Sequence, residues 1–391
     1  MNLPRLLYLG DVPVECSYHG SALLYRLLQD YPPERLLVLE PWPALSKPSR
    51  RLPAVRYGQT STWLARLLPS RYGKWYAPLY LALAGLDLAG ARRRMAHFQV
   101  EAILTVHHGY AWLPAAHLAR KLGIPLHLIL HDPFNEMACF PESLRTLLHH
   151  AFGKAYRQAA ARFCVSPYME QEYRQRHGVG AQVLYPGRAK DALFYDLPPE
   201  RLKDQPKQPT IAYAGNIEDA YWAALQCVAE TLLPLGGRLI IYSPRTREQA
   251  TRNGLTAPNV EMRGLVTSEE LMARLRAEAD LLFVTQSFAP LDKTNAQLSF
   301  PSKLTDYTAL ALPLLIYGPD YCSAVRWARA NPGVAEVVET QKPEMLVQVL
   351  VRIFNSAEVR LCLGKTAASV GRNYFSYEVA RNQFFSGLIR S

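Results

Sequence analysis

The sequence has no long hydrophobic run, no low-complexity tract and no C-x-x-C motif. Its longest weakly charged apolar stretch covers residues 77–91 and is interrupted by Asp87. This stretch is shorter than the roughly 20 apolar residues that span a bilayer. The N-terminus also lacks the apolar core and the small-residue cleavage site of a secretory signal. We therefore expect a globular cytoplasmic protein with no transmembrane helix.

The cysteines are few, and their positions exclude the usual zinc patterns. None has a nearby histidine at metal-ligand spacing, and most have apolar neighbours, the six being Cys16, Cys139, Cys164, Cys227, Cys322 and Cys362. We expect buried free thiols in a reducing compartment, and no metal site.

Acidic residues are almost missing from residues 41–100. This window contains ten Lys or Arg residues but a single acid, Asp87. Tryptophans and tyrosines are interleaved with these bases. Such a composition suits peripheral docking on an anionic membrane, here the inner face, although a solvated basic face is the open alternative. Nucleic acid is not expected as a partner, because no recognisable nucleic-acid module accompanies the charge.

Apolar, strand-like runs alternate with amphipathic, helix-like segments along the whole chain. The runs of the first half lie at 5–10, 35–40, 102–108, 126–132, 162–167 and 181–187, and those of the second half at 210–216, 238–243, 260–264, 280–286, 313–319 and 335–339. The main helical patterns lie at 19–30, 112–122, 142–160, 167–177, 219–233, 268–277, 301–311, 320–330, 343–354 and 376–389. Continuous apolar strands separated by helices predict parallel α/β sheets.

The alternation predicts two Rossmann-like domains that face a central cleft. The first domain covers residues 1–188 and the second covers 210–373. Residues 189–209 are polar and rich in proline, so they are predicted to be the linker. Ligands of such sheets bind at the carboxyl ends of the strands.

The segment "FPSKLTDYTALALPLLIYGP" begins a predicted helix with polar residues. Pro301 suits the first helical position, so Ser302 and Lys303 fall in the first turn, where free amides favour a phosphate. Asp306 shares their helix face and could accept hydrogen bonds from ribose hydroxyls. The open alternative is an ordinary capped helix with a Lys303–Asp306 pair on its surface.

This segment resembles the "PSKL-x-(E/D)-Y" region of GT-B fold glycosyltransferases, particularly the retaining enzymes of the family 4 type. The resemblance extends in the same order to "TIAYAGNI" (210–217), "VEMRGLV" (260–266), "LARKLGIPLHLILHDP" (118–133) and "CVSPYMEQEY" (164–173). It implies transfer of a sugar, a hexosyl group, from a nucleoside-diphosphate sugar to a glycan or lipid-linked acceptor in polysaccharide or glycoconjugate synthesis. No cofactor and no metal is expected. It also implies that residues 374–391 cross back to the first domain.

The resemblance assigns roles to particular residues. The nucleotide-sugar would be held by the second domain and by one loop of the first, through Asp306 at the ribose, Ser302 and Lys303 at the diphosphate, Gly215 and Asn216 in the glycine loop, Arg263, Gly264 and Leu265 around the base, and Gly20 near the donor phosphate. In the first domain His131 and Asp132 are the catalytic candidates, at the end of a strand. A histidine that only caps the strand is the alternative. His107 and His108 are interpreted as structural or acceptor-side residues.

The sequence departs from the family pattern at three places. The glutamate that often precedes the ribose acid by eight residues is replaced by Leu298, and the usual glycine after "AL" is Ala311. Glu218 and Asp219 stand where basic residues often follow the glycine loop. These departures leave open a non-catalytic nucleotide-binding protein of the same fold. A sugar-nucleotide epimerase, which also binds a nucleoside diphosphate, is the other alternative.

Overall fold

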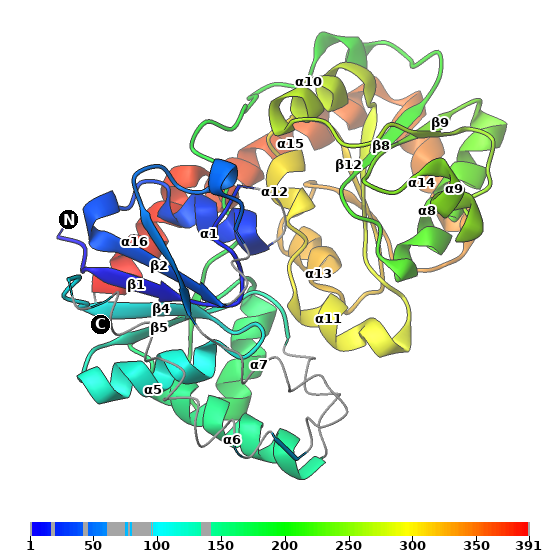
Figure 1. The fold of residues 1–391 in the computed structure, drawn as a ribbon. Coiled ribbons are helices and arrows are strands. Elements are labelled where there is room, and N and C mark those ends of the chain that lie inside the picture. Colours follow the sequence, from blue (N-terminus) through cyan, green and yellow to red (C-terminus); the bar gives the residue numbers. More distant parts are fainter. Residues whose placement is uncertain are drawn as a thin grey trace. The chain divides into compact units, whose positions relative to one another are not determined.

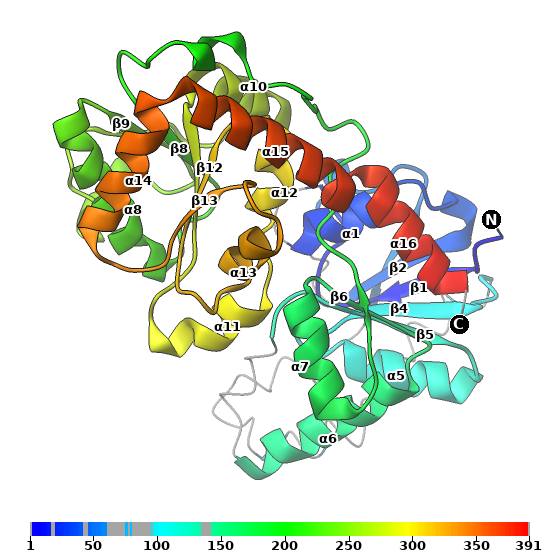
Figure 2. The ribbon, with the colours of Figure 1, turned by 180° about the vertical axis from the view of Figure 1, so that it is seen from behind.

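The computed structural model describes residues 2–16, 20–41, 46–60, 75–76, 79, 95, 97–133 and 142–389. The chain forms two compact units, one of residues 1–187 with 377–391 and the other of residues 188–376. Each unit contains one parallel sheet with helices on both faces (Figure 1 and Figure 2). The predicted α/β class is therefore confirmed.

The sheet of the first unit has the strand order β3-β2-β1-β4-β5-β6-β7. Its strands are β1 (Leu6–Leu9), β2 (Leu36–Pro41), β3 (Arg56–Thr60), β4 (Ala102–Val106), β5 (Leu126–Leu130), β6 (Ala161–Cys164) and β7 (Gln182–Val183). Leu6 pairs with both Leu36 and Ala102, so β1 is a central strand. The strand order reverses between β1 and β4, and ligands of open α/β sheets bind at such a reversal.

Strand β3 was not predicted from the sequence. Its residues read RYGQT, and only Gly58 and Thr60 are buried. The strand lies at the edge of the sheet and pairs with β2 alone, so it needs no continuous apolar run. Apolar periodicity does not detect an edge strand of this kind.

Helices cover both faces of the first sheet. They are α1 (Gly20–Leu28), α5 (Trp112–Leu122), α6 (Glu142–Gln158), α7 (Pro167–His177) and α16 (Tyr377–Ile389). The Ser166 hydroxyl accepts a hydrogen bond from Met169 N and so caps α7. Helix α16 packs beside α1 and against β6 (Figure 2), so the chain's last helix crosses back to the first unit.

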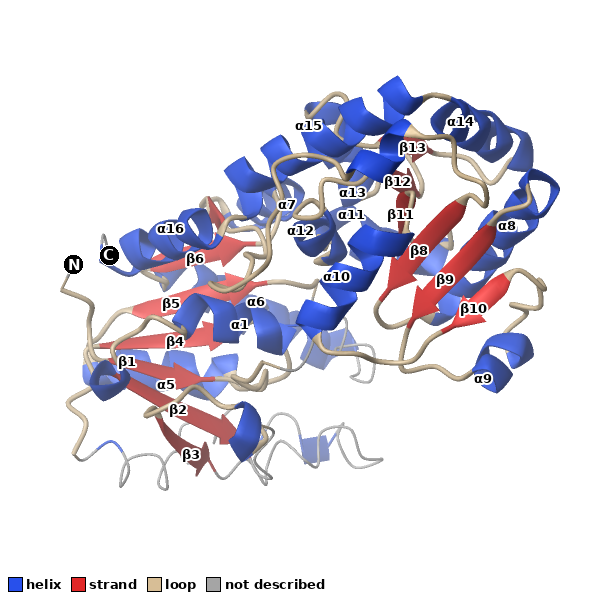
Figure 3. Cartoon of the chain, turned by 90° about the horizontal axis from the view of Figure 1, so that it is seen from above, coloured by secondary structure: helices blue, strands red, loops and turns tan. Residues whose placement is uncertain are grey.

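The sheet of the second unit has the order β10-β9-β8-β11-β12-β13 (Figure 3). Its strands are β8 (Thr210–Ala214), β9 (Arg238–Tyr242), β10 (Val260–Met262), β11 (Leu281–Thr285), β12 (Leu314–Tyr317) and β13 (Glu336–Val338). The order reverses between β8 and β11, which places a second binding edge at the carboxyl ends of these two strands.

The helices of the second unit are α8 (Trp222–Leu232), α9 (Arg247–Arg252), α10 (Ser268–Glu278), α11 (Lys293–Leu298), α12 (Lys303–Tyr307), α13 (Ser323–Ala330), α14 (Pro343–Asn355) and α15 (Ala357–Phe375). Helices α8 and α14 pack against each other over the sheet. Their apolar side chains join those of the strands in one buried cluster, which includes Leu225, Ile241, Phe283 and Leu350. Helices α12, α13 and α15 contact β11 or β12.

Residues 189–209, the predicted linker, lie within the second unit. Arg201 Nη1 donates a hydrogen bond of 2.7 Å to Asp280 Oδ1. The buried guanidinium of Arg360 donates to the carbonyl oxygens of Leu202 and Asp204. These bonds hold much of the segment on the unit's surface, although its composition is that of a linker.

The helix predicted at 301–311 is wrong in length, because α12 covers only residues 303–307. Leu304 N bonds to Pro301 O and Thr305 N to Ser302 O, which are short-range bonds of the tighter 3₁₀ type. The segment ends at Ala311, whose φ of 52° is left-handed. The long apolar run of the sequence therefore hides a short helix followed by turns.

The expectation of buried thiols is wrong for Cys16 and Cys362, which are exposed. Cys164 and Cys322 are buried, Cys227 is intermediate, and all five are free. Apolar neighbours in the sequence do not determine whether the cysteine itself faces the core or the solvent. Cys139 lies outside the described residues.

No helix in the described part of the chain is both long and apolar enough to cross a membrane. The predicted membrane-docking window, 41–100, falls mostly outside the described residues. Among its described bases, Arg51 lies over the Tyr57 ring and Arg56 over the Phe98 ring.

Candidate functional site

The glycine loop after β8 and helix α12 meet at the carboxyl edge of the second sheet. Gly215 has a φ of 123°, which side chains other than glycine rarely adopt. A Cβ at this position would lie 2.9 Å from Lys303 Cε. The backbone conformation therefore favours glycine, and the absence of a side chain leaves room for the end of the lysine. The structure thus brings together two residues that the sequence assigned to one diphosphate site.

Two tyrosines fix this arrangement. Tyr307 of α12 accepts a hydrogen bond of 2.6 Å from Ala214 N through its hydroxyl. Tyr213 donates one of 2.6 Å to Asn216 O. Both rings are buried, so each hydroxyl needs its partner. Helix α12 is thereby tied to the end of β8, and Asn216 is held in the same loop. Neither tyrosine was singled out from the sequence, although Tyr307 belongs to the recognised segment.

Lys303 places a cation over this loop. Its Nζ lies 4.8 Å from the centre of the Tyr213 ring and 5.9 Å from that of Tyr221. Burial lowers the pKa of Lys303 to about 8, against the opposing effect of the Glu218 carboxylate, which raises it. Glu218 accepts a hydrogen bond of 2.9 Å from Asn216 Nδ2. A bound phosphate would stabilise the ammonium form of this lysine.

The other two residues predicted from the helix lie on the same short segment. Asp306 is partly exposed on α12, and Ser302 is exposed at its start. The Ser302 side chain makes no capping hydrogen bond to the helix. The amides of Leu304 and Thr305 are already bonded to carbonyl oxygens. The predicted free amides are therefore not available at these two residues, and Lys303 is the main positive group of the turn.

The residues predicted around the base follow β10. Arg263 Nη2 lies 2.7 Å from Glu261 Oε2, and its Nη1 lies 2.6 Å from Glu278 Oε2. Gly264 adopts a left-handed φ of 67°, and Leu265 is 70% exposed. Strand β10 is two strands away from β8, a separation of about 10 Å at the usual spacing. A nucleotide can extend over this distance, from a base at β10 to phosphates at β8.

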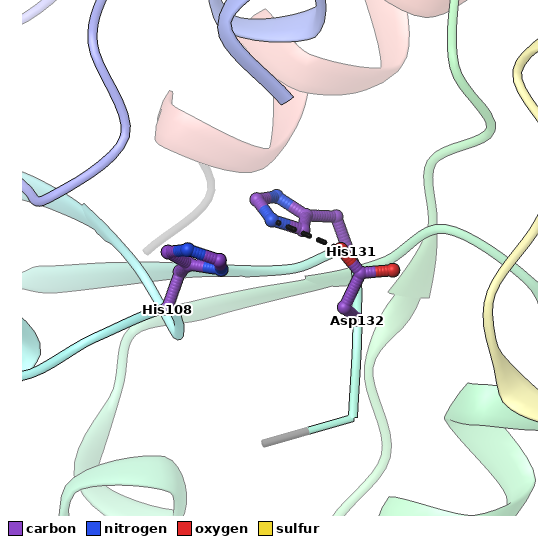
Figure 4. A group of neighbouring side chains, drawn as sticks. All are labelled: His108, His131 and Asp132. Carbon is purple, nitrogen blue, oxygen red and sulfur yellow. Dashed lines mark ion pairs between the residues drawn. The ribbon is translucent and has the colours of Figure 1, made fainter. Parts of the chain in front are cut away.

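In the first unit, His108, His131 and Asp132 lie together at the ends of β4 and β5 (Figure 4). His131 Nε2 is 3.5 Å from Asp132 Oδ2, and the two imidazole rings are 5.4 Å apart. One donor atom from each of the three residues lies within 4.8 Å of the others. Within the described residues, this is the group of side chains that could hold a divalent cation.

His131 is buried at this edge, with 9% of its surface exposed. Burial lowers its pKa, Asp132 opposes this effect, and His108 lowers the pKa further. Its imidazole is therefore neutral near pH 7, and a neutral imidazole can donate a hydrogen bond to a hydroxyl or accept one from it. Gly20, at the start of α1, touches the same ring, because a Cβ there would lie 2.8 Å from His131 Cε1. The structure thus brings Gly20 to His131.

His107 has a different environment from His108. It is buried, stacks on the Phe152 ring at 3.6 Å and contacts the Trp112 ring edge-on. Burial lowers the pKa of His107 well below its usual value. This neutral ring packs in an aromatic cluster, whereas His108 faces the group at the sheet edge.

Two parallel Rossmann-like sheets, with the last helix returning to the first unit, define the GT-B fold. Sucrose-phosphate synthase from Thermosynechococcus elongatus has a similar structure, with 14% identity, 97% of each chain covered and a TM-score of 0.67. Anabaena HepE in complex with UDP-glucose shows 14% identity, 98% coverage of each chain and a TM-score of 0.65. MurG from Acinetobacter baumannii shows 15% identity, 99% coverage of each chain and a TM-score of 0.55.

At the sequence level, residues 48–189 match the family model described as Glycosyltransferase Family 4. No curated protein matches the chain. The family match and the shared fold together confirm the resemblance to GT-B glycosyltransferases of the family 4 type. All but the last two residues of the match lie in the first unit, whereas the candidate nucleotide site lies in the second.

Proposed function

We propose that this protein is a glycosyltransferase that moves a hexosyl group from a nucleoside-diphosphate sugar to a glycan or lipid-linked acceptor, in polysaccharide or glycoconjugate synthesis. The observation that carries the proposal is the position of Lys303 over Gly215 at the reversal point of the second sheet. The structure of HepE with UDP-glucose supports a nucleotide-sugar as the donor.

In this proposal the second unit stabilises the departing nucleoside diphosphate. The Lys303 ammonium would neutralise the charge that develops on the leaving phosphate oxygen. Asp306 would accept hydrogen bonds from the ribose hydroxyls, and Leu265 would lie against the base. No metal ion is needed in this scheme, because a protonated lysine supplies the positive charge.

His131 would act at the reacting centre from the first unit. Its neutral imidazole can orient a hydroxyl of the sugar or of the acceptor, with Asp132 beside it. Leu298 occupies the position of the usual sugar-binding glutamate and is 3% exposed. The sugar hydroxyls must therefore be bound by other groups.

The first test is nucleotide binding by Asp306→Ala. UDP, GDP and ADP are titrated calorimetrically into the wild type, Asp306→Ala and a control, Glu344→Ala, which removes an exposed acid from α14. We expect Asp306→Ala to bind its preferred diphosphate at least about tenfold more weakly, the effect of losing hydrogen bonds to a charged acceptor. Equal affinity of all three proteins would remove the ribose assignment.

Turnover then separates the proposed activity from its alternatives. Incubation with a panel of nucleotide-sugars should give slow donor hydrolysis or acceptor-dependent release of the nucleotide. Interconversion of the sugar while it stays on the nucleotide would instead identify an epimerase. Binding without any turnover would identify a non-catalytic protein.

Membrane association through residues 41–100 is a separate part of the proposal. It rests on the excess of bases and aromatic residues in that window. Charge reversal at residues 92–94 should abolish cosedimentation with liposomes that contain anionic lipid. Equal cosedimentation of the wild type and the variant would contradict it.

A further inference from the structure

Arg188, the first residue of the second unit, is a charged residue buried with 4% of its surface exposed. Its Nε donates a hydrogen bond of 2.9 Å to Thr305 O. Its Nη2 donates one of 2.9 Å to Thr308 Oγ1. Its backbone N bonds to Phe375 O at 2.9 Å, which fixes the start of its side chain. Both side-chain bonds are made to α12 or to the residue directly after it.

Helix α12 depends on such contacts because it has only five residues. Helices of this length are not stable on their own, since the cost of nucleation exceeds the gain from so few bonds. The guanidinium lies at the C-terminal end, where a positive charge is favourable. Thr308 extends the contact, because its hydroxyl donates to Leu304 O at 2.7 Å while it accepts from Arg188.

The surroundings of the guanidinium are shaped for it. A Cβ at Gly371 of α15 would lie 2.6 Å from Arg188 Nη2, so a larger residue there would displace the side chain. The Phe194 ring lies on another side, with its centre 4.9 Å from Arg188 Cζ. The guanidinium is thus enclosed by an aromatic ring, a glycine and the two acceptors of the α12 segment.

We propose that Arg188 is a positioning residue for the nucleotide site. Arg188 holds the C-terminal end of α12, while the Tyr307 hydroxyl holds the helix to β8. These two anchors keep Lys303 over Gly215 and keep Asp306 on the exposed side of the turn. Arg188 itself acts only through α12. Its effect on a nucleotide rests on the proposed function, whereas its effect on the helix does not.

The test compares Arg188→Lys with a matched control, Arg360→Met. Lysine keeps the charge but cannot make both guanidinium bonds. Arg360 is equally buried, and its guanidinium also bonds to carbonyl oxygens of the second unit, but at the end of α14 rather than at α12. Both variants should unfold at lower temperature, so stability alone does not separate them. Amide hydrogen exchange of residues 303–311 and the affinity for UDP, GDP and ADP are measured for both.

We expect Arg188→Lys to raise exchange in residues 303–311 and to weaken diphosphate binding by about tenfold, the effect of losing a charge-assisted hydrogen bond. Arg360→Met should leave both quantities as in the wild type. Thr308→Val, which removes one acceptor but keeps the shape, should change both in the same direction by a smaller factor. Thr308→Val also provides the test of the contact if Arg188→Lys does not fold.

Three results would overturn the inference or its premise, and they are distinguishable. Unchanged exchange in Arg188→Lys or Thr308→Val would show that the contact does not hold α12. Raised exchange with unchanged diphosphate affinity would show that the contact is only structural. If the wild type binds none of the three diphosphates, the proposed function fails and the nucleotide role fails with it. The hydrogen-exchange data would then still show whether Arg188 stabilises α12.

Discussion

If Lys303 binds the diphosphate as proposed, its pKa makes that binding sensitive to mildly alkaline pH. Burial lowers this pKa to about 8 in the free protein, with Glu218 opposing the change. At pH 7 about nine in ten molecules carry the ammonium form, and at pH 9 about one in ten do. The diphosphate keeps its charge over this range, because phosphate ionises near pH 6. Between pH 7 and pH 9 it is therefore the charge of Lys303 that changes, and not the charge of the diphosphate.

The size of the effect follows from these fractions. If the ammonium binds the diphosphate and the neutral amine does not, affinity falls about tenfold between pH 7 and pH 9, or about 1.4 kcal/mol. Binding also raises the pKa of Lys303, so the protein takes up a proton. Stability changes in the opposite direction. The unfolded chain holds more protons above pH 8, so the free protein gains stability as pH rises from 8 towards the ordinary lysine pKa.

Calorimetry at pH 7, 8 and 9, in buffers of different ionisation enthalpy, measures both the affinity and the proton uptake. Lys303→Met should bind more weakly and show no pH dependence. Lys207→Met, which removes an exposed lysine of the same unit, should behave as the wild type. A wild-type affinity that stays constant from pH 7 to pH 9 would refute the assignment of Lys303 to the diphosphate.

Three further changes test other parts of the structure. Ala311→Gly should raise the free energy of unfolding by up to about 1 kcal/mol in urea titrations, and a loss of stability would contradict this. Glycine relieves the left-handed strain at φ 52°, about 1–2 kcal/mol, and gives back part of it through the more flexible unfolded chain. Leu298→Glu, which restores the usual family residue, should lower stability by at least about 2 kcal/mol, because it places a carboxylate in a buried site, and an unchanged midpoint would show that the site is open to water. His131→Ala should reduce sugar transfer at least about 100-fold and leave diphosphate affinity unchanged, whereas a parallel loss of both would contradict the proposed role of His131 at the reacting centre. Activity of the wild type should also survive chelation with EDTA. A loss restored by added cation would show that a metal is needed, with His108, His131 and Asp132 as the candidate ligands in the described residues.

Apolar periodicity was sufficient to predict most of both sheets. Buried parallel strands must be apolar along their whole length, so each central strand leaves a visible run in the sequence. Helices 112–122 and 167–177 were predicted with their observed bounds, because Gly123 ends the first helix and Ser166 with Pro167 begins the second. Family segments then indicated which strand ends carry the candidate site.

Two predictions failed for different physical reasons. Strand β3 is polar because it lies at a sheet edge, and α12 is short because 3₁₀-type bonds and a left-handed Ala311 bound it. The linker at 189–209 stays a prediction, and Arg201 within it donates a hydrogen bond to Asp280 of the second unit. Apolar periodicity reports burial, and it records neither the position of a strand in its sheet nor the turn-by-turn bonding of a short helix.

Local sequence identified Lys303, Gly215 and His131 as candidates, because each stands in a recognisable segment. Only the tertiary structure placed the lysine over the glycine and lowered its pKa, since burial depends on the rings of Tyr213 and Tyr221. The tertiary structure also decided that Arg188 bonds to the segment that carries Lys303. A buried charge needs partners with precise geometry, and those partners come from α12, a segment that only folding brings to it.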